Sequence, residues 1–206
     1  METEILLIRH GETEWNRKHI FQGKKDTELN STGVKQACKL SEYLSKKDYK
    51  FLYSSDLKRA VKTAEIIGKE ANLVPVKDSK IREMDFGDWE GSKFSTISKK
   101  DAESLNKWRQ DPLNNAPTGG ETLLEFSSRI TNFFDILTEK HQGEKIIVVT
   151  HGGVIRVWLS ELFDMPVDKF WQIEVQNTSM SRVKIYDGDP IFSLLNALPH
   201  LESEGE

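Results

Sequence analysis

The sequence is poor in cysteine and in long apolar runs, and both absences narrow what the protein can be. Its 206 residues contain one cysteine, Cys38, which excludes an intrachain disulfide and a metal site built from several thiolates. No apolar run approaches the ~20 residues that a helix needs to cross a bilayer, so we expect no membrane association. Residues Met1–Glu4 are acidic where a signal peptide is basic, which favours a cytoplasmic location.

An excess of positive charge is also missing. The chain has 29 Lys and Arg against 33 Asp and Glu, and no basic stripe stands out, which argues against a nucleic-acid partner. Apolar residues make up 37% of the chain, enough for a buried core and too many for a disordered protein. We therefore expect one domain over residues 1–206, in which the charge that binds any anion is concentrated locally.

Short apolar runs alternate with helical patterns along the chain. This alternation predicts an α/β fold: a three-layer sandwich with a mainly parallel central sheet covered on both faces. The predicted strands are Ile5–Ile8, Phe51–Tyr53, Val74–Val76, Ile146–Val149, Val183–Tyr186 and Phe192–Leu195. Three helices are predicted from apolar faces that include Val34, Ala37, Cys38, Ser41 and Leu44, then Leu57 to Gly68, then Phe126 to Leu137.

The stretch Gly91–Gly120 departs from this alternation. It contains Pro112, Pro117 and the pair Gly119-Gly120, with a modest helical pattern over Ile97–Trp108. Because these residues break regular structure, we expect a small helical cap inserted into the domain. Residues 202–206 are expected to form a frayed acidic tail.

Two of the predicted strands end in the same dipeptide, His-Gly. Arg9-His10-Gly11 follows the first strand, and His151-Gly152 follows Ile146–Val149. Ligands bind outside the carboxyl ends of parallel strands, so we expect both histidines at one rim. Arginine binds phosphate or carboxylate, and imidazole acts as nucleophile, base or acid near neutral pH. A polar turn would explain either motif alone, but their repetition favours a functional site.

Arg59 is the next candidate. Ser55 or Asp56 is expected to cap the helix that begins near Leu57, which places Arg59 in its first turn. A cation there opposes the helix dipole unless an anion binds beside it. If the position of Arg59 is considered alone, a solvated arginine is the simpler interpretation.

The segment Ile81–Gly91 is dense in carboxylates and aromatic residues. One of its carboxyl groups is a candidate general acid. We expect Phe86 and Trp89 to be mainly part of the core.

Other catalytic motifs are absent or misplaced. A cysteine phosphatase needs an arginine six positions after its cysteine, where this chain has Leu44, and Cys38 is expected on a core face. No Walker loop is present. Asp187-Gly188-Asp189 resembles the aspartyl motif of haloacid dehalogenase phosphatases, but it lies near the end of the chain and is expected to be a turn.

We predict no metal site, because acidic and thiol ligands are missing around His10 and His151. The remaining histidines are expected on the surface: His19, His141 and His200.

Six segments of the chain match one family in order. They are Leu7–Thr13 with Asn16, Phe21–Gly23, Leu29–Gly33, Ser54–Ala60, Glu83 and Thr150–Gly152. Together they resemble the signature of the histidine phosphatase superfamily, which includes the cofactor-dependent phosphoglycerate mutases. The resemblance spans nearly the whole chain.

The resemblance implies a role for each matched residue. His10 resembles the nucleophile that becomes phosphohistidine, and Glu83 resembles the acid that protonates the leaving alcohol and then activates water. Arg9, Arg59 and His151 resemble the pocket that holds the phosphoryl group, His151 helping most when protonated. Asn16, Gln22, Gly23 and Gly152 resemble substrate contacts. The resemblance implies neither a cofactor nor a metal.

Within the superfamily the chain is most similar to α-ribazole phosphatases, chiefly through Asp101–Ser104 before Trp108. This similarity implies hydrolysis of α-ribazole 5′-phosphate in cobalamin synthesis by a monomer or homodimer. A flat leaving group would suit Trp89, Phe94 and Trp108 if these face the pocket. The alternatives are a broad-specificity or phosphoserine phosphatase, a phosphoglycerate mutase, and a non-catalytic module that binds a phosphorylated partner.

Overall fold

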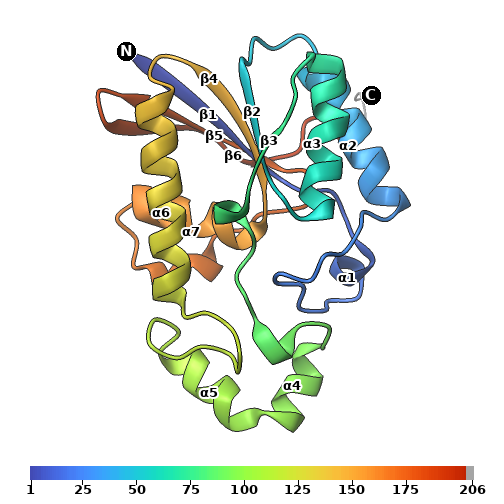
Figure 1. The fold of residues 1–206 in the computed structure, drawn as a ribbon, viewed down its shortest axis with the longest axis vertical. Helices are drawn as coiled ribbons and strands as arrows, with labels where there is room; N and C mark the ends of the chain where they lie inside the picture. Colours follow the sequence, from blue (N-terminus) through green and yellow to red (C-terminus); the bar gives the residue numbers. More distant parts are fainter. Residues whose placement is uncertain (203–206) are drawn as a thin grey trace.

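The computed structural model describes residues 1–202 and shows a six-stranded mixed sheet between two layers of helices (Figure 1). The strand order is β3-β2-β4-β1-β5-β6. Four strands are mutually parallel: β1 (Glu2–Arg9), β2 (Phe51–Ser55), β3 (Val76–Asp78) and β4 (Lys145–Thr150). An antiparallel hairpin, β5 (Met180–Tyr186) and β6 (Asp189–Ala197), completes the sheet. The predicted α/β sandwich with a mainly parallel sheet is confirmed.

Two pairs of helices cover the sheet. Figure 1 shows α2 (Ser31–Leu44) and α3 (Lys58–Ala71) on one face, with α6 (Leu123–Lys140) and α7 (Gly152–Leu162) on the other. Successive side chains of a strand point to opposite faces. Ile5 and Leu7 of β1 therefore join one core cluster with α6 and α7, and Leu6 and Ile8 join the other. Burial on both faces explains the unbroken apolar run of β1.

The central strands bring the two His-Gly dipeptides together. β1 and β4 are neighbours in a register that pairs Arg9 with Thr150. The chain continues in the same direction beyond both strands, and the amide of His10 donates to the carbonyl of Thr150 at 2.9 Å. His10 and His151 thus follow adjacent strands at one edge of the sheet.

The segment expected to form a cap carries two short helices, α4 (Phe94–Lys100) and α5 (Ala102–Gln110), which lie apart from the sheet (Figure 1). The helical pattern predicted over Ile97–Trp108 is interrupted at Asp101, whose φ of −141° ends α4. Asp101 accepts the indole N–H of Trp89 at 2.9 Å, and Trp89 packs edge-on against Trp108. These contacts join the two helices to the main core.

Shorter elements complete the path. They are α1 (Glu14–Arg17) and three 3₁₀ turns, η1 (Ser79–Ile81), η2 (Gly87–Trp89) and η3 (Val167–Gln172). The predicted turn at Asp187-Gly188 is confirmed: both residues have positive φ and link β5 to β6. Of the predicted tail, residues 203–206 lie outside the described residues.

Two predictions about packing are wrong. Cys38 is exposed, because the buried face of α2 runs through Ala37, Leu40 and Leu44, and Cys38 lies one helical step away. The edge strand β3 spans Val76–Asp78 rather than Val74–Val76, and Val74 is 86% exposed. An edge strand has one partner and little buried area, so its apolar residues mark its ends poorly.

The structure also corrects two of the three histidines expected on the surface. His19 is exposed, but His141 and His200 are buried. The ring of His141 hydrogen-bonds the Tyr53 hydroxyl at 2.8 Å, and Nε2 of His200 lies 3.0 Å from Oγ1 of Thr178. In each ring one nitrogen has a partner that lies far away in the sequence, which the residues around a lone histidine do not reveal.

In the part of the chain that the structure describes, none of the helices combines the length and the apolar character needed to cross a membrane.

Buried His200 generates a prediction about acid stability. Burial lowers the pKa of His200 to about 4 in the folded protein, against 6.5 in the unfolded chain. Its contribution is therefore complete above pH 6.5 and is lost as the pH falls toward 4. Urea unfolding across that range should show wild type losing about 1 kcal/mol more than His200→Gln, after solvent screening. A constant difference between the two proteins would contradict this.

Candidate active site

A cavity of about 250 Å³ lies at the carboxyl ends of β1 and β4. Seven of the nine predicted site residues line it: Arg9, His10, Asn16, Gln22, Gly23, Arg59 and Glu83. His151 and Gly152 are not on its wall, but the His151 ring lies behind His10, with ring centroids 5.2 Å apart. The structure thus brings together residues that are up to 142 positions apart in the sequence.

His10 is fixed in one tautomer. Its Nδ1 lies 2.7 Å from the carbonyl oxygen of Gly11, and that oxygen only accepts, so Nδ1 carries the hydrogen. The other nitrogen, Nε2, therefore keeps a free lone pair. Burial lowers the pKa of His10 well below 6.5, and the charges of Arg59 and Arg9 lower it further. His10 is a neutral imidazole with an unprotonated Nε2, as a nucleophile requires.

His151 differs from its sequence-based expectation. Burial, followed by the charges of Arg59 and Arg9, lowers its pKa well below 6.5. The expected protonated state is therefore disfavoured by the protein's own groups. Nε2 of His151 lies 2.8 Å from Oγ of Ser55, while Nδ1 is buried with no hydrogen-bond partner.

Arg59 is completely buried, which overturns the interpretation of a solvated arginine. Its terminal nitrogens donate to the carbonyls of Gly23 and Lys25, each at 2.7 Å, and its buried Nε has no partner. No carboxylate forms an ion pair with it among the described residues. Burial lowers the pKa of Arg59 to about 10, so the group keeps its charge at neutral pH.

The predicted cap of the helix that carries Arg59 is wrong. Leu57 is the residue at the N-cap, and the first free amide, that of Lys58, donates to Asp26 at 2.7 Å. Asp56 instead makes a two-pronged ion pair with Arg82, and Ser55 contacts His151. The residues that favoured a local cap are used by long-range contacts.

Arg9 adds a second positive charge. One terminal nitrogen donates to the carbonyl of Val175 at 2.7 Å, whereas its Nε is buried without a partner. Burial and the nearby Arg156 lower its pKa to about 10. Buried cations without carboxylate partners are costly to folding. The arrangement therefore favours an anion in the cavity.

Two amide side chains extend this donor set. The oxygen of Asn16 accepts from the backbone amide of Thr13 at 3.1 Å, and the oxygen of Gln22 accepts from the hydroxyls of Thr13 and Thr27. With both oxygens engaged, the NH₂ groups are left to donate to a ligand.

Gly23 is required by a close contact that the sequence analysis missed. A side chain at Gly23, whose φ is +50°, would overlap the Glu90 carboxylate. Glu90 accepts from the backbone amides of Lys24 and Lys25 at 2.8 and 3.1 Å. It thereby shapes the loop whose carbonyls hold Arg59. The sequence signal for Glu90 was only the abundance of carboxylates between positions 83 and 90.

Glu83 lies against the N-terminus of α7. Its two oxygens accept from the amides of Met84 at 3.0 Å and Gly153 at 3.1 Å. A Cβ on Gly153 would lie 2.2 Å from a Glu83 oxygen, so only glycine permits this approach. The second glycine of the His-Gly-Gly sequence thus places a carboxyl group at the cavity wall.

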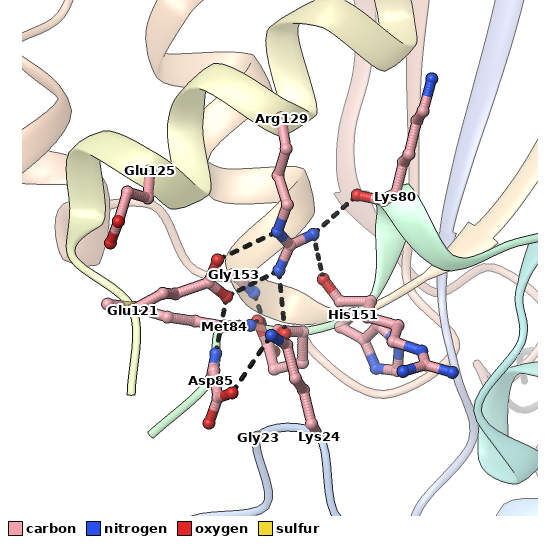
Figure 2. Close-up of polar contacts among 12 residues, drawn as sticks. Gly23, Lys24, Lys80, Met84, Asp85, Glu121, Glu125, Arg129, His151 and Gly153 are labelled. Carbon is pink, nitrogen blue, oxygen red and sulfur yellow. Dashed lines mark hydrogen bonds and ion pairs between the residues drawn. The ribbon is translucent and has the colours of Figure 1, made fainter. Parts of the chain in front are cut away.

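Arg129 of α6 holds the backbone around Glu83. Figure 2 shows its guanidinium between Glu121 and the segment 80–85. It donates to the carbonyls of Lys80, Arg82 and Glu83 at 2.6–3.1 Å, and to both oxygens of Glu121. Glu121 in turn accepts from the amide of Asp85 at 2.7 Å. Residues on both sides of Glu83 are therefore fixed to α6, a role the sequence analysis did not predict.

The aromatic wall of the cavity is not the one expected. Trp89, Phe94 and Trp108 are absent from the lining, where Phe21, Phe86, Phe170 and Trp171 are found instead. Trp89 and Trp108 are buried against each other, and Phe94 lies on the cap, 47% exposed. The hypothesis that those three contact a leaving group is wrong, because packing of the cap takes up two of them.

Within residues 1–202, no three His, Cys, Asp or Glu side chains are arranged to hold a metal ion.

The hydrogen bonds that Arg129 donates to Glu121 and to the backbone of residues 80–83 form a clamp. We predict that removing this clamp lowers the stability of the fold strongly. Arg129→Met removes five donated hydrogen bonds and leaves Glu121 unpaired, so we expect a loss of about 3 kcal/mol in the free energy of unfolding. Urea denaturation measures it. The control, Lys107→Met, breaks an exposed pair with Glu103 and should cost less than about 0.5 kcal/mol. Equal effects of the two substitutions would contradict the clamp.

The lowered pKa of His10 predicts its NMR titration. In phosphate-free buffer, its ring nitrogens should report a neutral Nδ1–H tautomer at pH 6.5, with no protonation midpoint there, because burial and two arginines oppose the charged form. A midpoint for His10 at or above 6.5 would show that the site does not hold this ring neutral.

Comparisons with known proteins identify the family. Residues 5–198 match the model of the histidine phosphatase superfamily, branch 1. Phosphoglycerate mutase-like protein 4 of Arabidopsis thaliana is 37% identical over 98% of this chain and 88% of its own. Phosphoserine phosphatase 1 of Hydrogenobacter thermophilus is 31% identical over 96% and 94%. The crystal structure of the α-ribazole phosphatase from Shigella flexneri superposes with a TM-score of 0.88 at 30% identity, covering 94% of this chain and 96% of that one.

These matches cover almost the whole chain and agree with the fold and with the motifs at the sheet edge. The chain therefore belongs to the histidine phosphatase superfamily, branch 1, and is a phosphatase of that family.

Proposed function

We propose that the chain hydrolyses phosphomonoesters through a phosphohistidine on His10, without a metal ion. The observation that most strongly supports this proposal is the environment of Nε2 of His10. The ring is neutral, its lone pair is free, and it lies in a cavity with two arginines, the fully buried Arg59 and the partly buried Arg9, that have no carboxylate partner within residues 1–202. Those arginines match the negative charge that phosphoryl transfer spreads over the equatorial oxygens.

The first step transfers the phosphoryl group to the protein. Nε2 of His10 forms a bond to phosphorus while the bond from phosphorus to the ester oxygen breaks. Arg9 and Arg59 stabilise the charge on the equatorial oxygens, with the amide groups of Asn16 and Gln22 as further donors. Glu83, protonated at this stage, gives its proton to the leaving oxygen.

The second step returns the site to its starting state. Glu83, now ionised, accepts a proton from a water molecule as the water oxygen attacks phosphorus. The bond between phosphorus and Nε2 breaks, and inorganic phosphate leaves. The negative phosphoryl group also raises the pKa of His151 from its low starting value, so that a protonated His151 can share the charge during both steps.

The sequence favours α-ribazole 5′-phosphate as the substrate, and we propose it as the first candidate. The aromatic wall of Phe21, Phe86, Phe170 and Trp171 offers flat apolar surface beside the phosphoryl site. The Shigella flexneri relative named above is an α-ribazole phosphatase. We also propose a cytoplasmic location and a monomeric or homodimeric state.

Phosphoserine is the second candidate. The Hydrogenobacter thermophilus relative is a phosphoserine phosphatase, and a third arginine on the cavity wall, Arg156, favours a substrate that carries further negative charge. Phosphate release from α-ribazole 5′-phosphate, phosphoserine, 3-phosphoglycerate and p-nitrophenyl phosphate, with EDTA present, ranks these substrates directly. Conversion between 2- and 3-phosphoglycerate in place of hydrolysis would indicate a mutase.

The chemistry itself is tested by trapping the intermediate. Brief mixing with p-nitrophenyl phosphate and quenching in alkali, where phosphohistidine survives, should give a protein heavier by one phosphoryl group. His10→Ala should abolish both the adduct and turnover, because it removes the attacking nitrogen. His200→Gln changes a histidine outside the cavity and should retain the adduct. Substantial turnover by His10→Ala would rule out this route.

A further inference from the structure

Arg156 of α7 is a charged residue on the cavity wall. The proposed phosphoryl transfer does not use it. Its Nε donates to the carbonyl of Ile173 at 2.8 Å, and its guanidinium lies over the Trp171 ring, 5.4 Å from the centroid. Neither terminal nitrogen has a hydrogen bond or an ion pair among the described residues. The fork of the guanidinium is therefore oriented by the protein and left unused.

Arg156 lies next to the phosphoryl pocket rather than inside it. A Cβ on Gly152 would be 3.2 Å from Nη1 of Arg156 and 3.5 Å from Nε of Arg9, so the two guanidinium groups adjoin with only glycine between them. After burial, the charges of Arg59 and Arg9 lower the pKa of both His10 and His151, so these two arginines are the ones beside the imidazole rings. Arg156 thus borders the phosphate site on the side of Trp171.

The charges on the wall are not balanced by a phosphate alone. Arg9, Arg59 and Arg156 share the cavity lining with one carboxyl group, Glu83, which must be protonated when it acts as the acid. Glu174 lies near Arg156 outside this lining and forms no ion pair with it among the described residues. A phosphomonoester carries at most about two negative charges near neutral pH. The three cations of the lining therefore outnumber these charges, and Arg156 is the one that the phosphoryl chemistry does not use.

We propose that Arg156 is a specificity-determining residue that binds a carboxylate on the leaving group of the substrate. A guanidinium held at Nε and stacked on an indole presents its two terminal nitrogens as a planar fork, the geometry that binds carboxylate in two-pronged fashion. The preferred substrates are small phosphomonoesters that carry a carboxylate near the ester oxygen. This inference rests on the proposed phosphomonoesterase activity and favours its second candidate substrate.

A matched pair of substrates isolates the carboxylate. O-phosphoserine and O-phosphoethanolamine differ only in that group, and p-nitrophenyl phosphate reports the phosphoryl chemistry on its own. For wild type, we expect kcat/KM to be about 10- to 100-fold higher for phosphoserine than for phosphoethanolamine, as one charged pair contributes. Arg156→Gln should reduce this ratio to about one, mainly through a higher KM for phosphoserine, and leave the rate with p-nitrophenyl phosphate nearly unchanged.

Two further variants control for charge and for folding. Arg156→Lys keeps the charge without the fork and should retain part of the preference. Lys24→Gln removes another positive charge next to Gly23, one that already pairs with Asp85, and should leave the ratio unchanged. Urea unfolding of each variant shows whether the contact with Ile173 matters only for stability.

The outcomes separate the two proposals. A wild-type ratio near one, or an unchanged ratio in Arg156→Gln, would overturn the role of Arg156 while the phosphatase activity stands. Equal loss of activity on all three substrates in Arg156→Gln would show that this arginine supports the phosphoryl site or the fold instead, and would also overturn the inference. Absence of wild-type activity on p-nitrophenyl phosphate and on both other esters would reject the proposed function itself.

Discussion

The site depends on two guanidinium groups that have no carboxylate partner within residues 1–202. Arg59 is completely enclosed and is held by the backbone carbonyls of Gly23 and Lys25 and, at 3.4 Å, by the Thr27 hydroxyl. Arg9 is partly buried, and its enclosed Nε has no partner among the described residues. Such charges oppose folding, so the surrounding structure must fix them. The loop 23–25 does this for Arg59, and Glu90 fixes that loop in turn. Burial, together with the same positive charges, lowers the pKa of His10 and keeps the ring neutral, as the proposed nucleophile has to be.

Glu83, the proposed acid, is positioned by a separate set of contacts. Glu83 reaches the cavity because Gly153 leaves room for it and because Arg129 fastens its backbone to α6. The cations come from the sheet edge and α3, while the carboxyl group comes from a loop secured on the opposite face of the sheet. Independent anchoring keeps Glu83 from collapsing onto Arg59 or Arg9 in an ion pair, which would neutralise both partners. No such pair forms within residues 1–202.

Much of this arrangement could be predicted from the sequence, because parallel strands carry their following residues to one edge. That rule places His10 and His151 together, and it needs only the two apolar runs before them. The cavity lining could not be predicted in the same way. Trp171 and Phe170 reach it from a 3₁₀ turn that no periodic pattern marks, whereas Trp89 and Trp108 are buried against each other. The prediction that Cys38 is buried was wrong for a simpler reason, because one helical step separates the buried face of α2 from the exposed one.

On the proposed mechanism, the cavity binds a phosphoryl group through the arginines of its own wall, without a metal ion. Calorimetric titration with orthovanadate, in buffer freed of metal ions beforehand and containing no chelator, tests it most directly, because this anion takes the geometry of phosphorus in transfer. The account predicts saturable binding of one vanadate per chain, accompanied by proton uptake as His151 becomes charged. Absence of binding, or binding that requires an added divalent metal, would contradict it.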